Sequence, residues 1–225
     1  MKKNDFLIQY FEKRKSKIIK FFILFLLGFL IVLTISNNFT PKNYIAKVHI
    51  EGIINNKDEL IKKLNDINQN KNIKGLLIIV NSPGGTFVSS KEILDVLEKI
   101  SGKIPTSAYM REMATSGAYL ASLGAKKIFA NQGTITGSIG VILQTAQLTS
   151  LMEKIGVKPI IIKSGELKAT PNPLEKLDDE KLKYLKKIIG QLQNQFIGIV
   201  EKKRNLNQNT ILKISSGRIF TSKQA

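Results

Sequence analysis

The chain has 225 residues, of which 43% are hydrophobic and 23% charged, so it can form one domain of about 180 residues and one further segment. It has no Cys and a single His, His49, which excludes disulfides, a Cys nucleophile and a Cys/His metal site, and we expect no cofactor. The net charge is +18, of which residues 1–20 contribute +5. Because no basic patch is interleaved with aromatic residues, this charge favours a solvated surface or anionic lipid over nucleic acid.

The first segment with a clear pattern is apolar. Residues 21–36, FFILFLLGFLIVLTIS, carry no charge, and Lys20 can direct its amine to the membrane interface, so that the run extends back to Ile18. The segment 18–36 is close to the roughly 20 residues that a hydrocarbon core requires. A cleaved signal peptide is the alternative, although TIS before Asn37 is a poor cleavage site.

Lys and Arg precede this segment, which predicts the orientation and the domain boundaries. The excess of positive charge on the N-terminal side places that side in the cytoplasm. We therefore predict a basic cytoplasmic segment at 1–17, a transmembrane anchor at 18–36 and a polar linker at 37–43. The folded domain, residues 44–225, would lie outside the cytoplasm at the cell (inner) membrane.

From residue 44 onwards, strand-like and helix-like segments alternate. Apolar residues that alternate or run together predict strands at 44–52, 74–80, 105–110, 126–130 and 158–164. Apolar residues three and four apart predict helices at 57–68, 89–101, 116–124, 149–156 and 178–205. The segment KGLLIIV at 74–80 is almost continuously apolar, as expected of a strand covered on both faces. The alternation predicts an α/β domain with a mostly parallel sheet.

Two small-residue turns could form a site for an anion. The predicted strand 74–80 stops at NSPGG, where Gly84 and Gly85 permit positive φ and close approach to a ligand. Ser116, in MATSGAYLAS, would lie at a helix N-terminus, which favours developing negative charge. The N–H groups of Gly117 and Gly85 could form a two-donor oxyanion hole. The structural alternatives are an ordinary turn for the glycine pair and a helix cap for Ser116.

A base that could activate Ser116 is harder to find. A Lys can replace His when desolvation lowers its pKa from about 10.4 towards the working pH. Lys168 is in the Gly/Pro/Thr-rich loop that follows the predicted strand 158–164, and Lys163 is its nearby rival. Ser138, in GTITGSIGV, could orient a neutral Lys amine through a hydrogen bond. The alternatives are an ordinary loop Lys and another glycine-rich turn.

Together, NSPGG, MATSGAYLAS, GTITGSIGV and KSGELKATPNP, in this order after an N-terminal anchor, resemble the signal peptide peptidase A (protease IV) family. That family belongs to the Clp protease/crotonase superfamily. The resemblance covers residues 44–225 and implies a repeated ββα superhelix with a mostly parallel sheet. The roles it implies are nucleophile for Ser116, general base for Lys168, orientation of the Lys amine for Ser138, and oxyanion hole for Gly84, Gly85 and Gly117.

The resemblance also implies a membrane-anchored serine endopeptidase that degrades remnant signal peptides and other hydrophobic membrane-associated peptides. Short family members assemble as rings in which adjacent subunits donate Ser and Lys, so we expect a homo-oligomer with shared sites. The segment SSGRIFTSKQA resembles one after which family chains continue, whereas this sequence ends at Ala225. A catalytically inactive or truncated membrane scaffold of the same fold is therefore the alternative.

Two other enzyme classes fit less well. An acyl-CoA enzyme of the crotonase type shares the oxyanion geometry but needs no Ser nucleophile. A His-dependent Clp-type peptidase would carry its His after the Ser, whereas His49 precedes Ser116.

Overall fold

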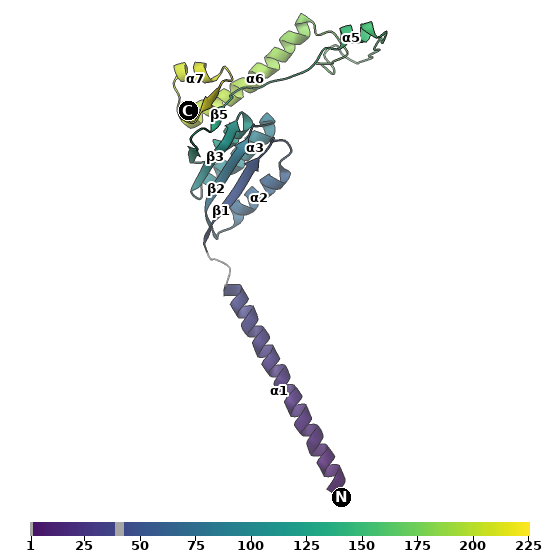
Figure 1. Ribbon diagram of the computed structural model, residues 1–225, viewed down its shortest axis with the longest axis vertical. Helices are drawn as coiled ribbons and strands as arrows, with labels where there is room; N and C mark the ends of the chain where they lie inside the picture. The colour runs from purple at the N-terminus through teal and green to yellow at the C-terminus, as the bar shows by residue number, and fades with distance from the viewer. Residues whose placement is uncertain (1, 39–42) are drawn as a thin grey trace. The chain divides into compact units, whose positions relative to one another are not determined.

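The computed structural model describes residues 2–38 and 43–225, and the chain divides into two compact units, residues 1–44 and 45–225. The first unit contains the helix α1 (Lys2–Asn38), purple in Figure 1. Its segment Lys13–Leu33 is long and apolar enough to cross a membrane, by length and composition, and none of it is buried. The predicted anchor 18–36 lies within this helix, whereas most of the predicted linker 37–43 lies outside the described residues.

The second unit is built around a mixed six-stranded sheet (Figure 1). Its strands are β1 (Tyr44–Glu51), β2 (Ile73–Ser82), β3 (Thr106–Thr115), β4 (Lys127–Ala130), β5 (Ile135–Gly137) and β6 (Ile219–Thr221). The order is β1-β2-β3-β5-β6, and β4 pairs with β3. Strands β2, β4 and β5 pair with β3 in parallel, and β6 is antiparallel to β5. The expected α/β class with a mostly parallel sheet is confirmed.

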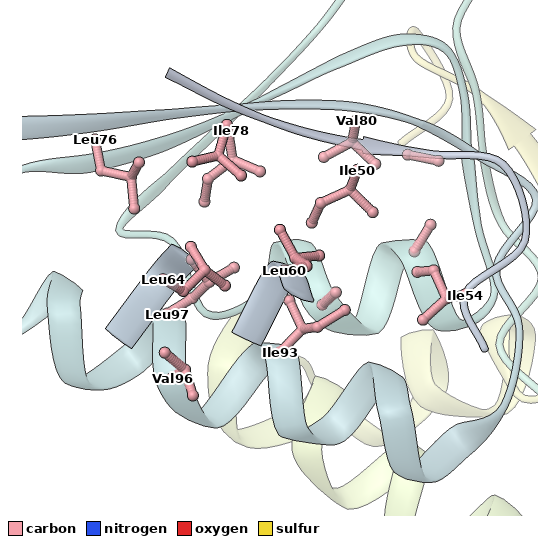
Figure 2. Close-up of a cluster of buried hydrophobic side chains, with 14 of the residues drawn as sticks. Ile50, Ile54, Leu60, Leu64, Leu76, Ile78, Val80, Ile93, Val96 and Leu97 are labelled. Atoms are coloured by element: carbon pink, nitrogen blue, oxygen red, sulfur yellow. The ribbon is translucent and has the colours of Figure 1, made fainter. Parts of the chain in front are cut away.

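The main hydrophobic core lies between this sheet and the helices that follow its first strands. The remaining helices are α2 (Asp58–Gln69), α3 (Phe87–Ser101), α4 (Gly117–Ser122), α5 (Thr149–Lys154), α6 (Asp179–Arg204) and α7 (Gln208–Ile214). In Figure 2, Ile50 and Ile78 of the strands face Leu64 of α2 and Leu97 of α3. On β1 the buried Val48 and Ile50 alternate with exposed residues, as the sequence pattern predicts.

Helix α6 joins the domain through a second, smaller cluster. Phe196 and Val200 of α6 pack with Leu94 of α3 and Leu120 of α4. An ion pair of 2.5 Å between Lys203 Nζ and Glu98 Oε1 also connects α6 to α3. At its other end, α6 is capped by Asp178, whose carboxylate accepts a hydrogen bond from the Lys181 N–H. This hydrogen bond lowers the pKa of the Asp178 carboxyl.

The predicted strand at 158–164 is wrong, because the structure, which describes all of these residues, has no strand there. Ile160 and Ile162 are 88% and 94% exposed, so the apolar run is not covered by its own chain. It belongs to a long excursion, residues 141–178, which leaves the sheet after β5 and carries α5 before α6 begins (Figure 1). An apolar strand pattern needs a neighbouring strand to pair with, and the fold supplies none at this position.

The other predicted elements are present, with shifted ends. Strand β3 continues beyond the predicted end at residue 110 to Thr115, because its second half pairs with β5. Periodicity does not reveal β5, β6 and α7, which are too short to show a repeating pattern. Strand β5 lies inside the segment GTITGSIGV that sequence alone presents as a glycine-rich turn.

Candidate active site

Ser116 occupies an abrupt change from β3 to α4. Its backbone has φ 53° and ψ −123°, a region that residues with a side chain rarely adopt. Its N–H donates to the Gly137 carbonyl oxygen at 2.8 Å, next to the Thr115–Gly137 pair of the β3–β5 ladder. Ser116 holds the N-cap position of α4, yet its side chain makes no capping hydrogen bond. The hydroxyl is therefore available for another role.

Ser138 has a matching position on the neighbouring strand. It follows β5 directly, its φ is also 53°, and its N–H donates to the Arg218 carbonyl oxygen at 2.8 Å. Because β3 and β5 are parallel, the residues that follow them leave the sheet at the same edge. Both Ser116 and Ser138 line one cavity of about 660 Å³.

Several parts of the chain that are distant in sequence meet at the cavity. Its polar side comes from the turn after β2, the start of α4 and the residues after β5. Its apolar side includes Ile53, Leu120 and Phe196, the last of these on α6. The loop after α7 closes another wall, where Gln193 Nε2 donates to the Ser215 carbonyl oxygen at 2.7 Å. Such a mixture of apolar walls and convergent polar groups is typical of ligand sites.

The glycines bring two backbone N–H groups together on this wall. Gly84 has φ +98°, and a Cβ there would lie 2.7 Å from the Gly117 nitrogen. The bridge between Gly85 and Ile54 uses the Gly84 carbonyl and the Thr86 N–H, so the Gly85 N–H has no partner among the described residues. Gly117 is the first residue of α4, where the N–H has no acceptor within the helix. A Cβ on Gly117 would lie only 3.1 Å from the Gly85 nitrogen.

Two buried hydroxyls that sequence reasoning missed hold this turn in place. Ser82 Oγ donates to the Gly52 carbonyl oxygen at 2.6 Å and accepts from the Gly84 N–H at 3.0 Å. Thr115 Oγ1 donates to the Pro83 carbonyl oxygen at 3.0 Å. Thr115 directly precedes Ser116 and Ser82 lies two residues before Gly84, but this proximity does not reveal the carbonyls that the two hydroxyls contact. The two hydroxyls fix the glycine turn against the end of β3.

Lys168 does not line the cavity within its own chain. It is exposed, in a turn of the excursion that is closed by its N–H donating to the Gly165 carbonyl oxygen at 3.0 Å. Its rival Lys163 is engaged elsewhere, with Nζ 2.7 Å from Glu175 Oε1. His49 lies on β1, with Nδ1 3.2 Å from Glu51 Oε1, and does not line this cavity either. A single chain thus brings Ser116, Ser138 and the three glycines together at one cavity. Lys168, the expected general base, does not line it.

The comparison with protein families decides what kind of protein carries this site. The model of peptidase family S49 matches residues 98–225, more than half of the chain, and the Clp protease model matches residues 45–148. The chain belongs to peptidase family S49. The expected resemblance to signal peptide peptidases is confirmed by relatives of this S49 chain.

Three relatives show how much of the S49 chain is shared. A Synechocystis protein named as a protease is 37% identical over 188 residues, 83% of this chain and 68% of the relative. A protein of Enterococcus faecium named as a signal peptide peptidase SppA is 37% identical over 171 residues, 76% of this chain and 50% of the relative. A protein of Methanocaldococcus jannaschii named as a protease is 34% identical, with 73% and 53% covered. The chain spans about half the length of the last two.

Solved structures confirm the fold of the S49 chain. ClpP1 of Listeria monocytogenes superposes with a TM-score of 0.54 at 16% identity, over 80% of this chain and 84% of that chain. A lysine-to-alanine variant of the 1510-N membrane-bound stomatin-specific protease, in complex with a substrate peptide, gives 0.54 at 19% identity, over 83% and 72%. These likenesses establish the Clp protease type of fold.

Proposed function

We propose that this S49 family member is a membrane-anchored serine endopeptidase in which Ser116 is the nucleophile and Lys168 the general base. The observation that carries the proposal is the convergence of the uncapped Ser116 hydroxyl, Ser138 and the N–H groups of Gly85 and Gly117 on one cavity. A strained residue with an available hydroxyl next to two unpaired donors is the arrangement that acyl transfer requires.

The reaction follows from the roles of these groups. Ser116 Oγ attacks the peptide carbonyl, and its proton passes to the neutral amine of Lys168, which Ser138 orients. The N–H groups of Gly85 and Gly117 donate to the developing oxyanion, each stabilising the transition state by about 3–4 kcal/mol. The resulting ammonium protonates the leaving amine. Water, with Lys168 again as base, then hydrolyses the acyl-enzyme and releases Ser116.

We propose further that Lys168 serves the site of an adjacent copy in a homo-oligomeric ring. The excursion contributes only its first residues, Val141 and Ile142, to the cavity of its own chain, and Lys168 does not line that cavity, as a site shared between subunits would require. It also exposes large apolar side chains, Ile142 at 87%, Ile160 at 88% and Ile162 at 94%. Apolar surface of this kind marks an interface, and a neighbouring copy that covered it would place Lys168 beside a second Ser116.

The proposed substrates are remnant signal peptides and other hydrophobic peptides in or near the bilayer. The apolar wall formed by Ile53, Leu120 and Phe196 suits apolar peptide side chains. A relative named as a signal peptide peptidase supports this substrate class, and a protein of similar fold is named as a membrane-bound protease. The candidate span Lys13–Leu33, with basic residues at its start, supports an anchor with a cytoplasmic N-terminus and an extracytoplasmic domain.

The decisive experiment separates the two catalytic groups and then recombines them. In the detergent-solubilised full chain, Ser116→Ala and Lys168→Ala should each lower kcat for a hydrophobic peptide by about 10³-fold or more. Co-expression of the two variants should restore about one quarter of the activity. In a ring that mixes the two chains at random, a site is complete only where a chain with an intact Ser116 adjoins a chain with an intact Lys168, which is about one case in four. Full activity of Lys168→Ala would refute the assigned base, and no recovery would place both groups in one chain.

An inactive scaffold is the alternative, favoured by the position of Lys168 outside the cavity of its own chain. A fluorophosphonate probe distinguishes the two, because it labels only an activated serine. We expect labelling of the folded protein and none of Ser116→Ala. A folded assembly that is not labelled would favour the scaffold.

A further inference from the structure

We propose that Lys163 and Glu175 form a clamp that shapes the loop carrying Lys168, which makes them positioning residues for the general base. The inference rests on the proposed function, since it concerns the delivery of that base. Neither residue would touch the substrate.

The clamp is closely coordinated and well shielded from water. Lys163 Nζ lies 2.7 Å from Glu175 Oε1 and donates to Oε2 at 2.9 Å. It also donates to the Glu166 carbonyl oxygen at 2.9 Å, so the three acceptors match the three N–H bonds of an ammonium. The side chains are 13% and 20% exposed, against 37% and 44% for the Lys91–Asp95 pair on α3. A pair this shielded is less weakened by solvent than an ordinary surface pair.

The position of the clamp in the chain indicates its role, which is to close the loop that carries Lys168. Lys163 and Glu175 bracket the segment that contains Lys168, and the Glu166 carbonyl is two residues before the proposed base. Inside the bracket the backbone has short-range turns, such as Thr170 N–H to the Leu167 carbonyl, and one long-range bond, in which the Leu148 N–H donates to the Pro173 carbonyl oxygen at 2.8 Å. The described residues 155–178 contain no helix or strand that could hold the loop instead. The ion pair is therefore the principal side-chain constraint across it.

The same contacts assign different tasks to the two rival lysines. The Lys163 amine has all three of its donors engaged, two of them by the Glu175 carboxylate, so it is committed to closing the loop. The Lys168 side chain, in contrast, is exposed and makes no ion pair within the described part of the chain. A base delivered to another copy must arrive in a fixed geometry, because misplacement by about 1 Å costs on the order of 10²-fold in rate. The clamp supplies that fixed geometry.

The first test breaks and then rebuilds the clamp in the full-length protein. Lys163→Met and Glu175→Gln should each lower kcat about 10- to 100-fold with KM changed less than about twofold, since the base and not the peptide site is misplaced. Combining Lys163→Glu with Glu175→Lys should recover much of kcat, because the exchanged charges still close the loop. Lys158→Met is the matched control, an exposed lysine of the same excursion without an ion pair among the described residues, and should leave kcat unchanged.

The second test uses co-expressed chains to ask which copy needs its clamp. In the mixture of Ser116→Ala and Lys168→Ala chains, only the Ser116→Ala chain supplies a working Lys168. Adding Lys163→Met to that chain should lower the recovered activity about 10-fold or more, whereas adding it to the Lys168→Ala chain should not. Equal loss in both placements would show a general assembly defect and would overturn the clamp.

The two proposals fail in different ways. Retained activity of Lys168→Ala would end the proposed function itself. Loss of activity in Lys168→Ala, together with unchanged kcat in Lys163→Met and Glu175→Gln, would end only the clamp. A charge exchange that folds and assembles but recovers nothing would also count against it.

Discussion

Ser116 and its neighbours show how much of the site follows from local sequence. The alternation of elements predicts that Ser116 begins a helix after one strand and that Gly84 and Gly85 follow another. Because parallel strands end at the same edge of a sheet, the two turns are expected to lie beside each other. The supporting roles of Ser82 and Thr115 were not predictable, because their partners are carbonyls that only the folded turn brings within reach.

Gly84 offers a prediction with an internal control. Gly84→Ala should lower kcat by about 10²-fold or more, because the added Cβ would push the Gly117 nitrogen out of the oxyanion hole. Gly133→Ala is the matched variant: Gly133 also has positive φ, +90°, but a Cβ there meets nothing within 4 Å. Gly133→Ala should lose about 1 kcal/mol of stability to backbone strain, and Gly84→Ala should lose more, because its Cβ also collides with neighbouring backbone. Peptide hydrolysis and urea unfolding measure the two effects; equal kcat in both variants would disprove the collision argument.

At the scale of elements, periodicity identifies long helices and strands but not what covers them. The run at 158–164 has the composition of a strand, yet no strand of its own chain lies beside it. The position of Lys168 was unpredictable for the same reason, because the excursion has too few contacts in one chain to define a site. Helix α6 is amphipathic, but its apolar face is covered unevenly: Leu185, Phe196 and Val200 are buried, whereas Leu182 is 37% exposed.

This asymmetry of α6 predicts different costs for two truncations in the same helix. Phe196 is 1% exposed and packs against Phe87, with ring centroids 6.3 Å apart. Phe196→Ala should therefore lower the free energy of unfolding by about 3–5 kcal/mol, whereas Leu182→Ala should cost about 1 kcal/mol or less. Urea unfolding of the detergent-solubilised, dissociated chain gives both values. Similar losses would mean that Leu182 is packed as tightly as Phe196.

At the scale of the whole molecule, the charge and hydropathy of the sequence predict a membrane topology, which the fold of the domain does not test. Helix α1 and the α/β domain are separate compact units, so the packing of one carries no information about the membrane topology of the other. Orientation depends instead on the Lys and Arg residues around the apolar segment, through their interaction with the membrane and its insertion machinery.

The absence of Cys from the sequence makes this topology directly measurable, because a single introduced Cys is the only thiol. Ser16→Cys lies in the basic segment before the predicted anchor 18–36, and Lys71→Cys lies in an exposed turn after α2. In intact cells that express the full chain, a membrane-impermeant maleimide should label Lys71→Cys, and should label Ser16→Cys only after permeabilisation, because basic flanks stay in the cytoplasm. The reverse pattern would invert the topology. If the membrane-bound protein no longer contained residue 16, the N-terminal segment would have been cleaved, and the proposal of an uncleaved anchor would be wrong.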